Sequence, residues 1–123
     1  MLYNKNIVLQ IIVSNFSNEL EMAIYEATKD LDGFELEEIF EQLIDFAEVD
    51  DIGNTEVVDY KVDVCDDVNV LHGIIKVDVS LDGYVHWDGE NEILDTQNYE
   101  FEFEFGFKDK EEKYYDFELE WRK

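Results

Sequence analysis

The sequence contains no proline, one cysteine and only 6 glycines among 123 residues. The single cysteine, Cys65, cannot form a disulfide within the chain, so a disulfide-stapled secreted scaffold is excluded. No stretch of about eighteen uncharged apolar residues occurs, and we therefore expect no transmembrane helix. The apolar stretch 7–13 is short and lacks a small-residue cleavage site, so it is a poor signal peptide. These absences predict a cytoplasmic protein that does not contact a membrane.

Basic residues are also scarce. The chain has 9 Lys and Arg against 33 Asp and Glu, which gives a formal net charge of -24. Direct binding to nucleic acid or to an anionic membrane requires a basic patch, so both are disfavoured. A net charge of about 2–8 in magnitude is enough to keep a small domain soluble. The excess charge therefore indicates either adaptation to high salt or a surface made for a basic partner.

Apolar residues, in contrast, are plentiful. They make up 46% of the chain and aromatic residues make up 15%, too much for a disordered acidic tail. The length fits one domain. We therefore expect a single acidic domain over 1–123, with helices at about 5–48 and a sheet at about 55–122.

The first third of the chain has apolar residues at helical spacing, from Ile7 to Leu31. Stretch 7–13 is rich in β-branched residues, which leaves a strand open there, and Asn18 is a candidate N-cap for a fresh helix over 19–31. A second helix is predicted over about Glu35–Glu48, followed by a break at 50–54. Its outer face would carry a second acidic ridge: Glu37, Glu38, Glu41, Asp45 and Glu48.

From Thr55 onward the hydrophobic period changes to two, which is typical of strands. Val58, Tyr60, Val62 and Val64 would face the core on the first strand, and a second strand runs over 75–81. Asp82-Gly83 predicts a hairpin turn into a short strand, Tyr84–Trp87, and a loop follows at 88–91. The expected fold class is α+β, with two N-terminal helices packed on one face of a four- to five-stranded, largely antiparallel sheet.

The clearest strands are Tyr99–Phe107 and Tyr114–Trp121, where aromatic and acidic residues alternate. Because successive side chains point to opposite faces, all the aromatic residues should face the core and the acids should face outward. Acids two apart on a strand lie about 6.6–6.8 Å apart. The prediction is a flat array of carboxylates with no Lys or Arg on that face. Its members are Glu100, Glu102, Glu104, Asp116, Glu118 and Glu120, extended across the sheet by Asp59, Asp63, Asp66, Asp67 and Asp78.

Carboxylates at this spacing resemble the row of phosphates along a nucleic-acid strand. Proteins that bind nucleic acid neutralise phosphates with Lys and Arg, mostly without reading sequence. The array could therefore occupy the cationic site of a basic nucleic-acid-binding protein such as a nuclease. In composition and layout, the chain resembles the loose class of small acidic phage or mobile-element inhibitors that imitate nucleic acid. Anti-restriction and anti-CRISPR proteins are examples.

Two other interpretations stay open. An immunity protein or antitoxin would neutralise one basic toxin and would depend on apolar anchors such as Trp87 or Trp121. Alternatively, the outward acids are a solvated face of a salt-adapted domain that has no basic partner. The terminal strand, Tyr114–Trp121, is a candidate free edge through which two copies could pair.

No pattern of residues predicts an enzyme. His72 and His86 have no His or Cys nearby at ligand spacing, and the acids beside Cys65 disfavour a nucleophilic thiolate. Segment 88–92 does not complete a calcium-binding loop, because Ile93 stands where the loop needs glycine. We therefore expect no catalytic residue, no metal site and no cofactor.

Overall fold

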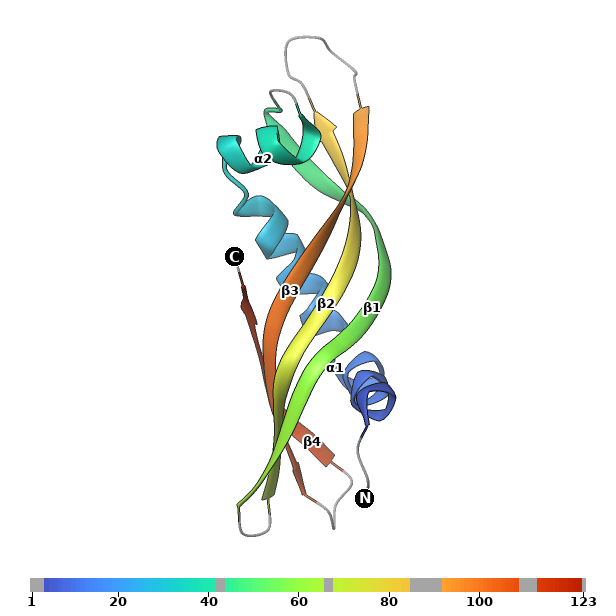
Figure 1. The fold of residues 1–123 in the computed structure, drawn as a ribbon, viewed down its shortest axis with the longest axis vertical. Coiled ribbons are helices and arrows are strands. Elements are labelled where there is room, and N and C mark those ends of the chain that lie inside the picture. Colours follow the sequence, from blue (N-terminus) through green and yellow to red (C-terminus); the bar gives the residue numbers. More distant parts are fainter. Residues whose placement is uncertain (1–3, 42–43, 66–67, 85–91, 109–112, 123) are drawn as a thin grey trace. The chain divides into compact units, whose positions relative to one another are not determined.

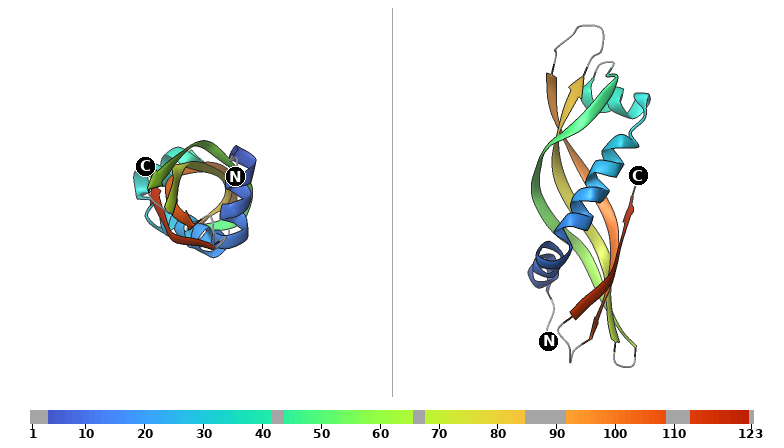
Figure 2. Two further views of the ribbon diagram at one scale, coloured as in Figure 1. Left: turned by 90° about the horizontal axis from the view of Figure 1, so that it is seen from below. Right: turned by 180° about the vertical axis from the view of Figure 1, so that it is seen from behind.

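The computed structural model describes residues 4–41, 44–65, 68–84, 92–108 and 113–122, without the side chains of 65 and 92–94 (Figure 1). Two helices, α1 (Lys5–Lys29) and α2 (Gly33–Phe40), precede four strands, β1 (Phe46–Cys65), β2 (Val68–Tyr84), β3 (Glu92–Lys108) and β4 (Lys113–Trp121). The strands form one antiparallel sheet in the order β1-β2-β3-β4 (Figures 1 and 2). The α+β class is therefore confirmed. The predicted strand Tyr84–Trp87 and loop 88–91 lie almost wholly outside the described residues.

The chain divides into two compact units. The first unit comprises Met1–Leu20, Thr55–Lys76 and Glu100–Lys123, and the second comprises Glu21–Asn54 and Val77–Tyr99. The first unit therefore contains the start of α1, the end of β1, the start of β2, the end of β3 and all of β4. The second unit contains the end of α1, all of α2 and the remaining halves of β1, β2 and β3.

Helix α1 includes stretch 7–13, so the strand alternative for that stretch is wrong. The side-chain oxygen of Asn4 accepts a hydrogen bond from the backbone nitrogen of Ile7 at 2.9 Å, which caps the helix. The helix is interrupted at Phe16 (φ -129°, ψ 23°), two residues before the predicted cap at Asn18. The Phe16 ring stacks on Phe117 of β4 at a centroid distance of 4.3 Å. This contact places Phe16 in the core of the first unit.

In the second unit, the end of α1 contacts β3 through a buried pair of hydroxyl groups. The hydroxyl oxygens of Thr28 and Tyr99 lie 3.0 Å apart. Burial raises the pKa of the Tyr99 phenol, while the hydrogen bond with Thr28 acts in the opposite direction. The hydrogen bond satisfies two polar groups that would otherwise be costly to bury.

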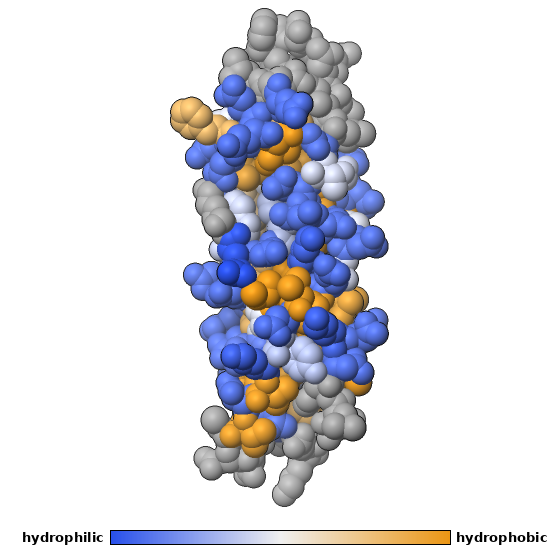
Figure 3. Space-filling view, in the orientation of Figure 1, coloured by the Kyte–Doolittle hydropathy of each residue, from blue (hydrophilic) through white to orange (hydrophobic). Residues whose placement is uncertain are grey.

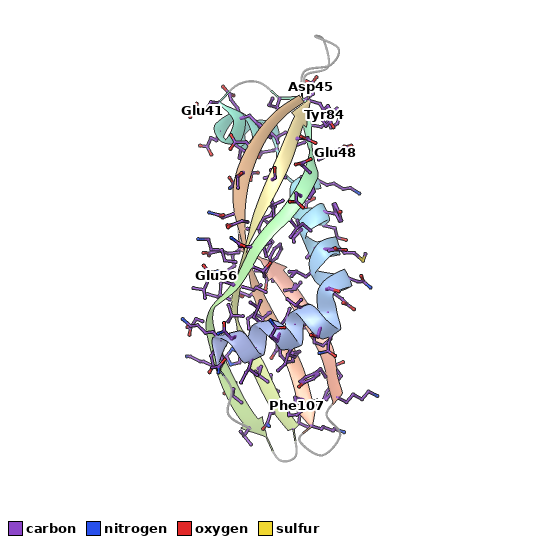
Figure 4. All side chains as sticks on the ribbon, turned by 90° about the vertical axis from the view of Figure 1, so that its right-hand side faces the viewer. Glu41, Asp45, Glu48, Glu56, Tyr84 and Phe107 are labelled. Atoms are coloured by element: carbon purple, nitrogen blue, oxygen red, sulfur yellow. The ribbon has the colours of Figure 1, made fainter. Side chains whose placement is uncertain are left out.

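Helix α2 is shorter than predicted, because its last residue is Phe40 rather than Glu48. Asp32 and Glu35 form a capping box at its start, and Glu41 ends it in the left-handed conformation (φ 57°). After α2 the chain enters the sheet. The backbone nitrogen of Asp45 donates to the carbonyl of Tyr84 at 3.0 Å, and both residues are labelled at the same end of the sheet in Figure 4. The Phe46 and Tyr84 rings stack at a centroid distance of 4.8 Å. The predicted acidic ridge is therefore divided between α2, a connecting segment and β1.

The strands run through two segments that the sequence predicted to be turns. Strand β1 continues through 50–54, and β2 continues through Asp82-Gly83. At Gly83, a Cβ atom would lie 3.0 Å from the ring of Phe40, and at Gly53 it would lie 3.3 Å from the carbonyl oxygen of Asp78. These glycines therefore allow close approach of neighbouring groups within continuous strands, and the two turn predictions are wrong.

The core is made by alternating residues of β2 and β3 together with α1 and α2. On β1 the prediction that Val58 and Val64 face the core is wrong, because both are exposed. The neighbouring Val57 is buried instead. The alternation shifts near Asp59, whose carboxylate accepts a hydrogen bond from the backbone nitrogen of Tyr60 at 2.9 Å. The core residues that are least exposed include Val8, Ile12, Ile24, Leu71, Ile75, Val77, Val79, Leu81, Phe101 and Phe105.

Candidate functional site

The register of β3 and β4 sets two pairs of glutamates directly opposite each other. Glu102 pairs with Glu120, and Glu104 pairs with Glu118. All four are exposed, whereas Phe103, between the two glutamates of β3, is buried. The predicted separation of acids and core residues is therefore confirmed along this stretch. Opposed like charges destabilise a strand pair, so this arrangement has a cost for the isolated protein.

A bulge interrupts the row of acids beyond Glu104. The register shifts between Glu104 and Gly106, and Asp116 adopts a positive φ of 56° on the opposing strand. Asp116 is exposed and lies at this bulge, where β4 has one residue more than β3. The regular spacing of the opposed acids therefore ends at Glu104 and Glu118.

The bulge also changes the positions of two tyrosines. Tyr114 pairs with Phe107 and stacks on its ring at 4.8 Å, whereas Tyr115 pairs with Gly106. A Cβ atom on Gly106 would lie 2.7 Å from the Tyr115 ring, so this ring covers the glycine on the acidic face. The prediction that every aromatic residue of the two strands faces the core is therefore wrong for Tyr115.

The acidic face is not free of basic residues. The Arg122 guanidinium lies 3.7 Å from a carboxylate oxygen of Glu100 and 3.7 Å from one of Glu102. Lys108 lies over the Tyr115 ring at 6.0 Å from the ring centroid. The prediction of no Lys or Arg on this face is therefore wrong. Because Arg122 is 44% exposed, each of its ion pairs contributes only about 0–1 kcal/mol.

The first unit has a hollow of about 920 Å³, and residues from all four strands line it. Two predicted acids of β1 thereby join the glutamates of β3 and β4. Lys61 and His72 also line the hollow, and the His72 Nε2 atom lies 2.9 Å from a carboxylate oxygen of Asp63. We call this region the acidic hollow. Its six carboxylates belong to Asp59, Asp63, Glu102, Glu104, Glu118 and Glu120.

Three other predicted site residues are not among those that line the acidic hollow. Glu100 contacts Arg122, and Asp116 lies at the bulge. Asp78 lies on β2 within the second unit and is partly buried. Two further acids of the predicted array, at positions 66 and 67, lie outside the described residues.

The second unit contains a cluster of acidic residues that the sequence did not predict. One carboxylate oxygen of Asp82 is shielded from solvent and has no hydrogen-bond partner in the described structure. Burial raises the pKa of Asp82, and the charges of Asp50 and Glu48 raise it further. Asp50 in turn accepts a hydrogen bond from Ser80 at 3.3 Å. Because the sequence predicted a turn at Asp82-Gly83, it did not predict that this part of β2 lies beside β1.

The Trp and His residues that the sequence analysis considered do not form a second site within the described structure. Trp121 pairs with Phe101 on the core side and is partly exposed, while Trp87 and His86 lie outside the described residues. Within the described ranges, no three His, Cys, Asp or Glu residues lie close enough to hold a metal ion. Neither described helix combines the length and apolar composition that are needed to cross a bilayer. No protein-family model, curated protein or solved structure matches this chain.

Proposed function

We propose that this protein is a non-enzymatic inhibitor that presents its acidic sheet face to the cationic nucleic-acid-binding site of a partner protein. The observation that carries the proposal is the pair of opposed glutamate couples, Glu102 with Glu120 and Glu104 with Glu118. In this proposal both helices pack on the other face of the sheet and leave the acids accessible. The protein would act in the cytoplasm, as anti-restriction and anti-CRISPR inhibitors from phages do.

The electrostatics of these couples favour a basic partner. Opposed carboxylates repel each other, and a Lys or Arg placed between them removes the repulsion and gains charge-assisted hydrogen bonds. Glu104, Glu118 and Glu120 make no ion pair with any residue that the structure describes. Their negative charge is thus available to a partner.

The spacing of the couples supports an imitation of phosphate rows. Residues two apart on a strand lie about 6.6–6.8 Å apart, and neighbouring strands lie about 4.8 Å apart. Sites that grip nucleic acid bind phosphates largely through charge and position. The net charge of -24 would in addition accelerate association with a basic protein by electrostatic steering.

The test is capture of binding proteins from a lysate at low and at high salt, followed by purification of each captured protein and a competition assay. We expect basic nucleic-acid-binding proteins to be retained at low salt, released by added salt, and displaced by duplex DNA or RNA. The variant E102Q/E104Q/E118Q/E120Q should lose binding while keeping its fold. The control E19Q/E21Q/E26Q/D30N changes four exposed acids of α1 and its C-terminal end, and it removes the same charge.

Unchanged binding by the strand variant, with its fold confirmed by circular dichroism, would eliminate β3 and β4 from the mechanism. Equal loss in both variants would mean that net charge alone drives binding.

The alternative is an immunity protein or antitoxin for one basic toxin. The volume of the acidic hollow, about 920 Å³, favours it, because a hollow of this size can receive a projecting part of a single enzyme. The same competition assay separates the two functions. A toxin whose substrate is not a nucleic acid would stay bound in the presence of excess duplex.

A further inference from the structure

We propose that the acidic hollow substitutes for a nucleic-acid groove and receives a basic α-helix of the partner. The inference rests on the proposed function and specifies the part of the partner that makes contact. A partner of this kind reads nucleic acid by inserting a helix into a groove, and does not enclose a convex duplex in a cleft.

The shape of the acidic hollow suits a helix. A surface that imitates the outside of a duplex should be convex, but the carboxylates of the first unit line a hollow of about 920 Å³. A helix with its side chains is about 10–12 Å in diameter, so this volume equals roughly two helical turns. The major groove of B-DNA, about 12 Å wide, also admits one helix. The hollow therefore has the capacity to accept the element that the groove accepts.

The spacing of the carboxylates also suits a helix. Glu102 and Glu104 on β3 face Glu120 and Glu118 on β4, which gives two carboxylate couples separated along the strands. The separation expected for residues two apart on a strand is about 6.6–6.8 Å. Residues four apart on an α-helix are separated by about 6 Å along its axis and lie on the same side. A helix with arginines at i and i+4 can therefore place one guanidinium at each couple.

The side chains that line the hollow suit arginine. A guanidinium is planar and can hydrogen-bond two carboxylates at once, which a couple of opposed glutamates provides. The hollow is also lined by Ile74, which is only partly buried and lies beside the buried Ile75 on β2. Its apolar surface can cover the aliphatic stem of a long basic side chain. On the β1 and β2 side, Asp63 is already engaged by His72, and on β3 the Arg122 guanidinium lies 3.7 Å from Glu102. The couple of Glu104 with Glu118 is therefore the main contact point, and Glu120 of the other couple remains available beside it.

The test uses two peptides of about 16 residues with the same alanine-rich composition and four arginines. In the striped peptide the arginines follow i, i+4 spacing, and in the scattered isomer they are distributed around the helix. Affinity is measured for the full chain by calorimetry at low salt. We expect the striped peptide to bind at least about tenfold more tightly than the scattered isomer, because only the stripe faces both couples.

The double variant E104Q/E118Q removes one couple, and E21Q/E26Q removes the same charge from exposed positions of α1. The first should weaken binding of the striped peptide by about tenfold, and the second by less than about twofold. Equal affinities for the two peptides, or equal losses in the two variants, would overturn the inference. The experiment contains no nucleic-acid-binding protein, so its failure does not affect the proposed function. Conversely, a failed capture experiment would overturn the proposed function, while a striped-peptide preference would still support a helix-binding hollow.

Discussion

At the residue scale, Gly73 shows how closely β1 and β2 approach each other in the first unit. A Cβ atom there would lie 2.7 Å from the Cα of Tyr60 and 2.9 Å from the carbonyl carbon of Asp59. Both neighbours are main-chain atoms, which cannot rotate away as a side chain could. Gly106 differs, because the group that covers it is the side chain of Tyr115. Substitutions at the two glycines should therefore differ in cost.

We predict that Gly73→Ala lowers the free energy of unfolding by about 3 kcal/mol, since the strands must separate to admit the methyl group. Gly33→Ala is the matched control, because no atom lies within 4 Å of its Cβ position at the start of α2. That control should be neutral or stabilise by up to about 1 kcal/mol. Urea denaturation of both variants measures the difference. A G73A variant as stable as G33A would show that β1 does not approach β2 this closely.

At the element scale, β1 and β2 of the second unit bring three acids together. Asp82 has a shielded carboxylate oxygen, and Asp50 and Glu48 add their negative charges. Burial raises the pKa of Asp82 above its ordinary value of 3.8. The folded protein therefore favours the neutral carboxylic acid more than the unfolded chain does. The stabilisation from the neutral form is complete below pH 3.8 and is lost as the pH rises through the folded pKa.

We accordingly predict that Asp82→Asn raises the melting temperature at pH 7, because the neutral amide lacks the charge that burial and the neighbouring Asp50 and Glu48 disfavour. The advantage should shrink as the pH falls through the raised pKa and should disappear below about pH 3.8. Asp51→Asn, at an exposed position of β1, is the control and should show no such pH-dependent gain. Melting curves from pH 3 to pH 7 supply the measurement. A variant that is less stable than wild type at pH 7 would contradict the assignment.

The elements also show which parts of the fold can be predicted from sequence. Strict alternation predicted the pairing of β3 with β4, because aromatic and acidic residues cannot exchange faces without burying charge. Helix α2 and the turns were less predictable. Gly53 and Gly83 are close-approach positions in strands, and local sequence cannot distinguish these from turns. The bulge at Asp116 and the ion pairs of Arg122 depend on cross-strand register, which alternation alone does not specify.

For the candidate site, sequence predicted the acids but not their arrangement. It anticipated that Asp59 and Asp63 would join the glutamates of β3 and β4, and all six line the acidic hollow. It did not anticipate a hollow, because the sequence pattern gives the face of a side chain but not the curvature of the sheet. The sequence also did not predict the cluster of acids around Asp82. A turn was predicted at Asp82-Gly83, so this end of β2 was not expected to lie beside β1.

At the scale of the whole molecule, charge repulsion acts against the folded state. The net charge of -24 is uncompensated, yet 46% of the residues are apolar and supply a substantial core. A salt-adapted domain without a partner should unfold at low salt. A conventional core should keep this protein folded there, with repulsion lowering its stability only in part.

We predict that the protein remains folded at about 0.01 M salt and becomes more stable towards 1 M NaCl, where the screening length falls from about 30 Å to 3 Å. Circular dichroism at both salt concentrations, combined with urea denaturation, checks this. The E102Q/E104Q/E118Q/E120Q variant should show a weaker dependence on salt, because the opposed couples are removed. Loss of secondary structure at low salt would support the salt-adapted alternative instead.

The opposed glutamates also have a consequence for contacts between copies of this protein. They place like charges along β4, which is at the edge of the sheet. Edge strands that lack such charges readily pair with other chains. The same carboxylates that would attract a basic partner should therefore also prevent two copies from pairing through β4.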